Sequence, residues 1–269
     1  MEASDYREKV RAFRASKKLG QNFLINRSVA KTEANFGIGR KVIEMGPGLG
    51  ILTGELCKVA KSVIAVEKDR ALYDYLSEAM KSKNLELING DFFKVPARKL
   101  SGFDIMIANI PYNLSSKTLM WLGEKGMPAV LCLQKEFVAH MLAKPDTENY
   151  SRLSVMCALQ FTITPIIDVP ANDFYPEPRV SSSIVFVRPK KTKASKSLLD
   201  IVTLVMEHKK KKIRNAVLDS EKMLGLTKES AEKVLESLPH SDGRAFQLSP
   251  EELLEIARHI SRRLKDQNP

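Results

Sequence analysis

Cysteine and histidine are scarce in this chain, with three cysteines and four histidines among 269 residues. Cys57, Cys132 and Cys157 lie far apart among apolar residues. Their spacing favours reduced core thiols over a disulfide framework or a zinc site. No two histidines stand at the spacing of zinc ligands, so we expect no metal.

Long apolar runs are missing as well. The stretch from Val155 to Ile167 is interrupted by Gln160, Thr162, Thr164 and Pro165, and no run reaches the roughly 18 residues that a membrane helix needs. The first residues mix charges of both signs without an apolar core, so no targeting peptide is predicted. We therefore expect a cytoplasmic protein without a membrane partner.

Acidic residues are too few to balance the basic ones. The chain has 43 Lys and Arg against 32 Asp and Glu, a net charge of +11, within a composition that is 43% hydrophobic and 28% charged. Between Lys190 and Arg214, nine basic residues stand against Asp200 and Glu207, a local excess of +7 (nine minus two). This soluble, basic composition favours a polyanionic partner bound through phosphate contacts.

Short apolar runs alternate with helical periodicity in the first half of the chain. This alternation predicts an α/β fold with a mostly parallel, doubly wound sheet, in which ligands bind outside the carboxyl ends of the strands. The predicted strands are 41–45, 62–66, 85–88, 103–108 and 127–133, and the predicted helices follow Gly50 and span 69–80, with Asp69 as a cap, and 135–142.

The pattern changes beyond Tyr150. Residues 153–167 and 183–187 are predicted to be two strands, an antiparallel pair that closes the sheet edge. A polar linker over 189–196 is followed by helical spacing over 198–206, 213–218, 228–238 and 250–264, and Ser249 with Glu252 forms a capping box before the last of these. We therefore predict two domains: 1–189, the sheet with an N-terminal basic segment, and 190–269, a small helical domain.

Three consecutive strand ends carry groups that suit a nucleoside. A glycine turn over 46–50 follows the strand that contains Glu44, Glu67 ends the second strand, and Asp91 follows the third. Glycines let a ligand approach the backbone closely, and an acidic side chain at the second strand end can accept hydrogen bonds from ribose hydroxyls. We expect a nucleoside-containing cofactor here; the alternative is a tight turn followed by two helix caps.

The segment Asn109-Ile110-Pro111-Tyr112 follows the fourth strand. An adenine exocyclic amine is a poor nucleophile because its lone pair is delocalised into the ring. The Asn109 side-chain oxygen and the Ile110 carbonyl can each accept an amine hydrogen while the nitrogen attacks a sulfonium methyl group. Pro111 stiffens the turn, and Tyr112 can stack on an extruded base. The segment predicts a base-methylation site, and a simple proline turn is the alternative.

Together these motifs resemble the ribosomal RNA small-subunit adenine dimethyltransferase family of the KsgA type. The resemblance implies a class I (Rossmann-like) methyltransferase sheet, S-adenosylmethionine as cofactor, and dimethylation of N6 in two adjacent adenosines near the 3′ end of small-subunit RNA, in an immature subunit during ribosome biogenesis. It extends over 17–24, 46–50, Glu67, 89–91, 109–112, 134–136, 150–155, 174–181 and, more loosely, 244–249.

The resemblance also implies a role for individual residues. In the implied cofactor site, the methionine end is lined by Gln21, Asn22, Leu24 and Asn109, the glycines beneath are Gly46 and Gly48, the ribose is held by Glu67, and the adenine amine is read by Asp91. In the implied catalytic site, the target base is handled by Asn109, Ile110, Pro111 and Tyr112, with Phe174 on its other face.

The basic run from His208 to Arg214 has two interpretations. Its candidate RNA-binding residues are Lys209, Lys210, Lys211, Lys212 and Arg214, and the alternative is a solvated helix face. Other functions also stay open: an assembly factor that acts mainly by binding the small subunit, a large-subunit ribosomal RNA adenine methyltransferase, and, with less support, a DNA adenine methyltransferase or a nicotinamide dehydrogenase. We expect the protein to act as a monomer.

Overall fold

The computed structural model describes residues 10, 13, 21–191 and 194–265. The chain forms two compact units, one of residues up to 138 together with 163–189, the other of 139–162 together with the residues from 190 onward. The predicted N-terminal basic segment and residues 17–20 of the motif that ends at Leu24 lie outside the described residues, apart from Val10 and Phe13. In the described part of the chain, no helix is long and apolar enough to cross a bilayer.

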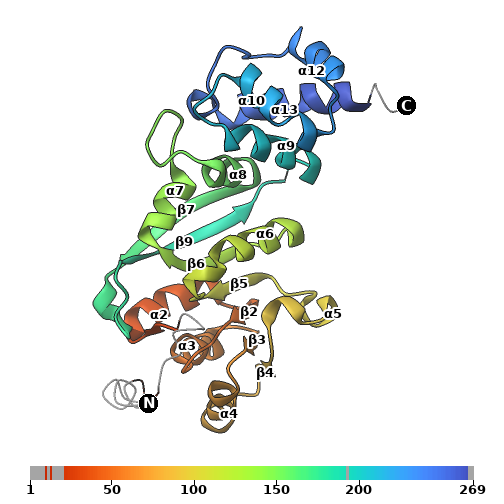
Figure 1. Cartoon of the computed structure of the whole chain (residues 1–269). Coiled ribbons are helices and arrows are strands. Elements are labelled where there is room, and N and C mark those ends of the chain that lie inside the picture. The colour runs from red at the N-terminus through yellow and green to blue at the C-terminus, as the bar shows by residue number, and fades with distance from the viewer. Residues whose placement is uncertain (1–9, 11–12, 14–20, 192–193, 266–269) are drawn as a thin grey trace. The chain divides into compact units, whose positions relative to one another are not determined.

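A seven-stranded sheet has the order β4-β3-β2-β5-β6-β9-β7, as Figure 1 shows. The first five of these strands pair in parallel, and β9 is antiparallel to β6. Strand order reverses between β2 and β5, which is where ligands bind in doubly wound sheets. The predicted α/β class is confirmed. The bounds are β2 Lys41–Met45, β3 Ser62–Glu67, β4 Leu85–Asn89, β5 Ile105–Ala108, β6 Ala129–Gln134, β7 Phe161–Val169 and β9 Ser182–Pro189.

The predicted strand over 153–167 is wrong in its first half. Residues Arg152–Gln160 form helix α8, and β7 begins only at Phe161. A capping box starts the helix: the Ser151 backbone N–H donates to Ser154 Oγ over 3.0 Å. A short apolar run has the same appearance in a buried helix and a buried strand, because periodicity alone does not separate them.

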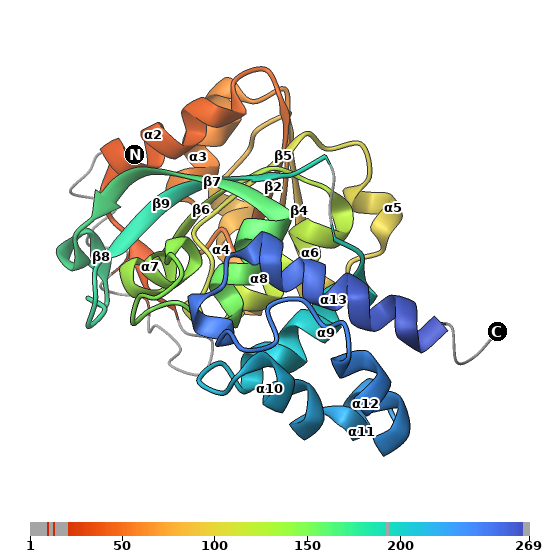
Figure 2. The same ribbon diagram turned by 90° about the horizontal axis from the view of Figure 1, so that it is seen from above.

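Helices α2 (Arg27–Ala34) and α3 (Ile51–Val59) lie side by side, as Figure 2 shows. Leu52 and Leu56 of α3 pack in one apolar core with Val42 of β2 and Ile105 of β5. The other elements before Val138 are α4 Arg70–Ala79, α5 Ala97–Leu100, α6 Ser115–Lys125, the start of α7 Lys135–Leu142, and the 3₁₀ turns η2 Asn35–Gly37, η3 Phe92–Lys94 and η4 Tyr112–Leu114.

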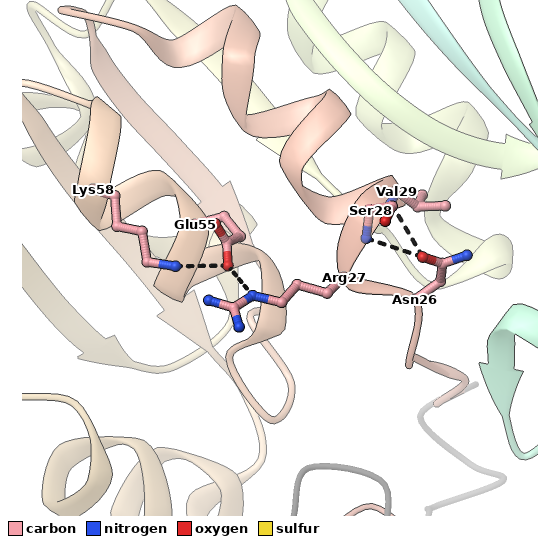
Figure 3. Close-up of polar contacts among 6 residues, drawn as sticks. All are labelled: Asn26, Arg27, Ser28, Val29, Glu55 and Lys58. Atoms are coloured by element: carbon pink, nitrogen blue, oxygen red, sulfur yellow. Dashed lines mark hydrogen bonds and ion pairs between the residues drawn. The ribbon is translucent and has the colours of Figure 1, made fainter. Parts of the chain in front are cut away.

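Polar contacts hold the start of α2 in place (Figure 3). Asn26 caps the helix, accepting hydrogen bonds from the backbone N–H groups of Ser28 and Val29 at 3.0 and 3.4 Å. Glu55 of α3 accepts from Arg27 at 2.6 Å and from Lys58 at 2.7 Å. Burial alone would raise the pKa of Glu55, but Lys58 and Arg27 lower it by more. The pKa therefore lies below its usual value, and the carboxylate stays charged. The ion pair therefore joins α2 to α3.

The second unit consists mainly of helices: the C-terminal ones, drawn from teal to blue in Figure 1, the end of α7, and α8. Its core contains Tyr150, whose hydroxyl donates to the Leu248 carbonyl over 2.8 Å. The capping box is confirmed, because Glu252 N–H donates to Ser249 Oγ at 3.2 Å and Ser249 N–H donates to Glu252 Oε2 at 2.8 Å. The helices are α9 Lys196–Glu207, α10 Ile213–Asp219, α11 Glu221–Leu224, α12 Lys228–Leu235 and α13 Pro250–Lys265, with η6 Ala245–Gln247.

The second unit differs from the predicted helical domain of 190–269, because it also takes in residues 139–162. Helix α8 carries Val155 and Leu159 into the same apolar core as Val202 of α9 and Ile256 of α13. Residues 139–162 lie in the chain between two parts of the first unit, so a single boundary placed at the linker could not assign them to the second unit.

Candidate active site

The carboxyl ends of the central parallel strands surround a cavity of about 320 Å³ in the first unit. Leu24 is 3% exposed and packs in the apolar core, so it does not line the cavity. Every other residue predicted for the cofactor or the target base does line it: Gln21, Asn22, Gly46, Gly48, Glu67, Asp91, Asn109, Ile110, Pro111, Tyr112 and Phe174.

A two-stranded sheet brings the N-terminal segment to the cavity. Strand β1 (Phe23–Leu24) pairs antiparallel with β8 (Phe174–Tyr175), so that Leu24 stands opposite Phe174. The backbone N–H of Ile25 donates to the Asp173 carbonyl in η5 (Ala171–Asp173) over 2.8 Å. Asn22 and Phe174, on either side of this pairing, both line the cavity.

The glycine turn presents bare backbone to the cavity. Gly46 and Gly48 have φ of +70° and +58°, a conformation that glycine adopts readily. A Cβ atom on Gly48 would lie only 3.0 Å from Phe23 Cδ1. The turn therefore requires glycine at this position, for its conformation and for space.

Glu67 ends β3 beside this turn and is 5% exposed. Its Oε2 accepts from the Gly48 backbone N–H at 3.1 Å, and its Oε1 accepts from the Asp69 N–H at 2.8 Å. Burial raises the pKa of Glu67, and these two N–H groups oppose that rise. Helix α4 is capped by Asp69, as predicted, because Asp69 accepts from Ala71 and Leu72. Glu67 therefore holds the glycine turn and is not a helix cap.

Asp91 occupies the end of β4. It caps η3 by accepting from the Phe93 N–H at 3.1 Å, and Lys68 Nζ lies 3.1 Å from its Oδ2. Burial raises the pKa of Asp91, but Lys68 and the Phe93 N–H lower it by more. Asp91 is therefore a cap, as the alternative interpretation predicted, and it also lines the cavity.

Asn109 follows β5 and contacts a residue that the sequence analysis missed. Its Nδ2 donates to Glu33 Oε2 over 3.2 Å, whereas its Oδ1 is buried without a hydrogen-bond partner. Tyr112 is oriented from the side of β9, because its hydroxyl is hydrogen-bonded to Ser182 Oγ at 2.8 Å. Asn109, with one unpaired acceptor, and Tyr112 therefore line the cavity together.

Two buried carboxyl groups, Glu33 and Glu44, lie behind the cavity wall. Both are at most 1% exposed, and burial raises the pKa of each to about 8, so both are largely protonated at neutral pH. A signal for Glu33 was present in the sequence, since it lies on the same helical stripe as Val29 and Ala30. A charged residue within an apolar stripe indicates a buried polar contact.

Phe93 and Lys117 also line the cavity, without any signal in the sequence that we could identify. Lys117 Nζ lies 4.1 Å from the centre of the Phe93 ring, a cation–π contact. All three cysteines are free thiols, and Cys132 reaches the cavity wall. Among the described residues, no three His, Cys, Asp or Glu side chains are grouped so as to hold a metal ion.

The basic run lies in the turn between α9 and α10, so its interpretation as a helix face is wrong for Lys209 to Lys212. Lys209 Nζ donates to the Tyr150 carbonyl at 2.6 Å, which makes this lysine part of the unit's internal packing. The remaining lysines, Lys210, Lys211 and Lys212, are exposed and line a groove in the second unit. The other residues that line this groove are Asn215, Leu218, Asp219 and Arg244.

The chain is similar to known proteins over most of its length. The model of a family described as "Ribosomal RNA adenine dimethylase" matches residues 12–245. A protein of Thermococcus sibiricus named "Probable ribosomal RNA small subunit methyltransferase A" is 38% identical over 246 residues, which cover 88% of this chain and 89% of the relative. A protein of the same name from Thermococcus gammatolerans is 39% identical over 252 residues, covering 90% and 88%.

Solved structures show the same fold. A dimethyladenosine transferase from Plasmodium falciparum superposes with a TM-score of 0.73 at 26% identity, covering 90% of this chain and 98% of that one. The 23S rRNA methyltransferase ErmE has a TM-score of 0.59 at 24% identity, covering 89% and 100%, and supports the fold alone. With the family model matching most of its length, the chain belongs to the ribosomal RNA adenine dimethylase family.

Proposed function

We propose that this enzyme uses S-adenosylmethionine to dimethylate N6 of two adjacent adenosines near the 3′ end of small-subunit ribosomal RNA, in immature subunits in the cytoplasm. The observation that carries this proposal is that Asn109, whose Oδ1 has no hydrogen-bond partner, lines one cavity with the glycine turn and Glu67. We also propose that the enzyme acts as a monomer.

The cavity residues fit an adenosine-containing cofactor. The Glu67 carboxylate accepts from the backbone N–H groups of Gly48, Asp69 and Lys68. A carboxylate offers about four acceptor sites, so one is left for the ribose hydroxyls. Asp91 presents an acceptor for an adenine amine, and Gly46 and Gly48 leave room above the turn. When bound, S-adenosylmethionine would supply an electrophilic methyl group.

Asn109 and its neighbours would activate the target amine. The Asn109 Oδ1 and the Ile110 carbonyl each accept one amine hydrogen, which draws the nitrogen toward a tetrahedral geometry with its lone pair available. Tyr112 uses its hydroxyl on Ser182, so its ring is what remains to stack on the base. Phe174 of β8, which also lines the cavity, would contact the other face.

The names of the Thermococcus relatives favour the small subunit over the large-subunit alternative. The deciding experiment incubates immature small subunits and large subunits separately with radiolabelled S-adenosylmethionine and maps the modified nucleotides by mass spectrometry. We expect dimethylated adenosines at two adjacent positions near the 3′ end of the small-subunit RNA. Label confined to large-subunit RNA would support the other methyltransferase, and tight binding without label would support an assembly factor.

The exposed part of the basic run is proposed to contact RNA phosphates. Replacing Lys210, Lys211, Lys212 and Arg214 with Gln should lower RNA affinity and flatten the plot of log K against log salt by up to about 0.7 to 0.9 per lost contact. Binding of S-adenosylmethionine should not change. Lys209 is retained, because its bond to the Tyr150 carbonyl is internal.

The matched control for this salt titration removes the same charge elsewhere. The control carries Gln at four exposed lysines of the first unit, namely Lys31, Lys61, Lys83 and Lys125. We expect its salt slope to stay closer to that of the unaltered protein. If the variant with Gln at Lys210, Lys211, Lys212 and Arg214 had the same salt slope and the same RNA affinity as the unaltered protein, phosphate contacts by these residues would be contradicted.

A further inference from the structure

We propose that Glu33 is a positioning residue, which fixes the side-chain amide of Asn109 so that its Oδ1 is directed at the target amine. Glu33 is fully buried, does not line the cavity, and has no part in the chemistry described above. The inference rests on the proposed function, since it concerns the acceptor that this function requires of Asn109.

An asparagine amide has two ends of similar shape and opposite hydrogen-bonding character. Rotation by half a turn would exchange the Asn109 oxygen, which accepts, for the NH₂ group, which only donates and would repel the amine hydrogens. In the structure the NH₂ end is engaged, because Nδ2 donates to Glu33 Oε2 over 3.2 Å. The oxygen end is therefore left without a partner, on a side chain that lines the cavity.

The buried carboxyl can perform this task without carrying a full charge. The pKa of Glu33 is raised to about 8. Burial is the main cause, the hydrogen bond from Asn109 lowers the pKa, and the nearby Glu44 raises it. A protonated carboxyl still has a carbonyl oxygen that accepts from Asn109 Nδ2. A glutamine side chain has the same acceptor, so it should serve nearly as well as glutamate.

Contacts at the start of α2 help to fix the position of Glu33. Asn26, the cap of α2, also donates through Nδ2 to Asp173 Oδ2 at 3.0 Å, next to Phe174. Arg27 is held by Glu55 of α3 at 2.6 Å (Figure 3). These contacts fix the start of α2 and so the last turn of the helix, from which Glu33 reaches Asn109.

A purely structural role makes a different prediction. Glu33 Oε1 is buried without a partner, which disfavours the folded state. An apolar side chain of similar length should therefore leave the protein as stable or make it more stable. If Glu33 only filled space, such a replacement would not harm catalysis; if it positions Asn109, stability and activity should move in opposite directions.

The test compares E33M and E33Q with the unaltered protein on small-subunit RNA. For E33M we expect an unchanged or higher Tm, unchanged Kd for S-adenosylmethionine, unchanged KM for RNA, and a kcat about 10- to 100-fold lower. E33Q should stay within about 3-fold of the unaltered kcat. In single-turnover measurements on an N109A background, E33M should cause no further loss, because its effect acts through Asn109.

A second measurement does not depend on activity. In ¹⁵N spectra, the side-chain NH₂ of Asn109, identified by its absence in N109A, should be protected from hydrogen exchange in the unaltered protein and in E33Q but not in E33M. Loss of methylation in the unaltered protein would refute the proposed function, and this spectrum would still judge the contact. The inference is overturned by an unaltered kcat in E33M, by equal losses in E33Q and E33M, or by an Asn109 NH₂ equally protected in E33M.

Discussion

Asn109→Ala is expected to lower methyl transfer by at least about a hundredfold while RNA binding survives. Removing a preorganised hydrogen-bonding group at the reacting atom typically costs about 10² to 10³ in kcat. Phosphate contacts supply most RNA affinity, and Asn109 lies in a cavity lined entirely by the first unit. Single-turnover transfer of radiolabelled methyl groups measures the loss, and a gel-shift assay on the same RNA measures binding.

The matched control is Asn35→Ala, which removes an exposed amide of the first unit that does not line the cavity. This control should keep full turnover. The family resemblance places Asn109 near the methionine end of the cofactor, so S-adenosylmethionine affinity is measured separately and transfer is assayed at saturation. Near-normal turnover in saturated Asn109→Ala would remove this residue from the mechanism.

Glu67→Ala is expected to weaken S-adenosylmethionine binding by about 1.5 to 3 kcal/mol, or roughly 10- to 150-fold in Kd. Two effects add in this variant. The ribose hydroxyls lose a charged acceptor, and the N–H groups of Gly48 and Asp69 lose the carboxylate that orients the glycine turn. Isothermal titration calorimetry with the folded variant gives the affinity, and its Tm shows whether the turn alone has been disturbed.

Glu67→Gln separates these two effects. The glutamine keeps one side-chain oxygen as an acceptor but donates at its other end, so it cannot satisfy both the turn and the ribose. We expect an intermediate affinity. An S-adenosylmethionine affinity unchanged by Glu67→Ala in a folded protein would show that the end of β3 does not hold the ribose.

Much of the first unit could be predicted because its signals are local. The glycine turn at 46–50 and the Asp69 cap each depend on residues within a few positions of one another, and the same holds for the Ser249–Glu252 box of the second unit. Parallel pairing then brings the ends of β2, β3, β4 and β5 to one edge of the sheet, as the alternation of strands and helices requires. The family and the fold class followed from these features.

Where the sequence prediction failed or found nothing, contacts between distant segments decided the outcome. Residues 152–160 became helix α8 because Val155 and Leu159 pack against helices from the end of the chain. Leu24 entered the core, and Phe174 reached the cavity, through the pairing of β1 with β8.

The sequence by itself determined which chemical groups this protein carries at its strand ends, since spacing along the chain places them there. Only the tertiary structure decided which of those groups remain free to act. Asn109 keeps an unpaired oxygen while its NH₂ group donates to Glu33 on another element. Lys209 differs from the exposed Lys210 because its ammonium group donates a hydrogen bond to the Tyr150 carbonyl. Hydrogen-bond partners distant in sequence are set by packing, and periodicity reports only whether a side chain faces the core.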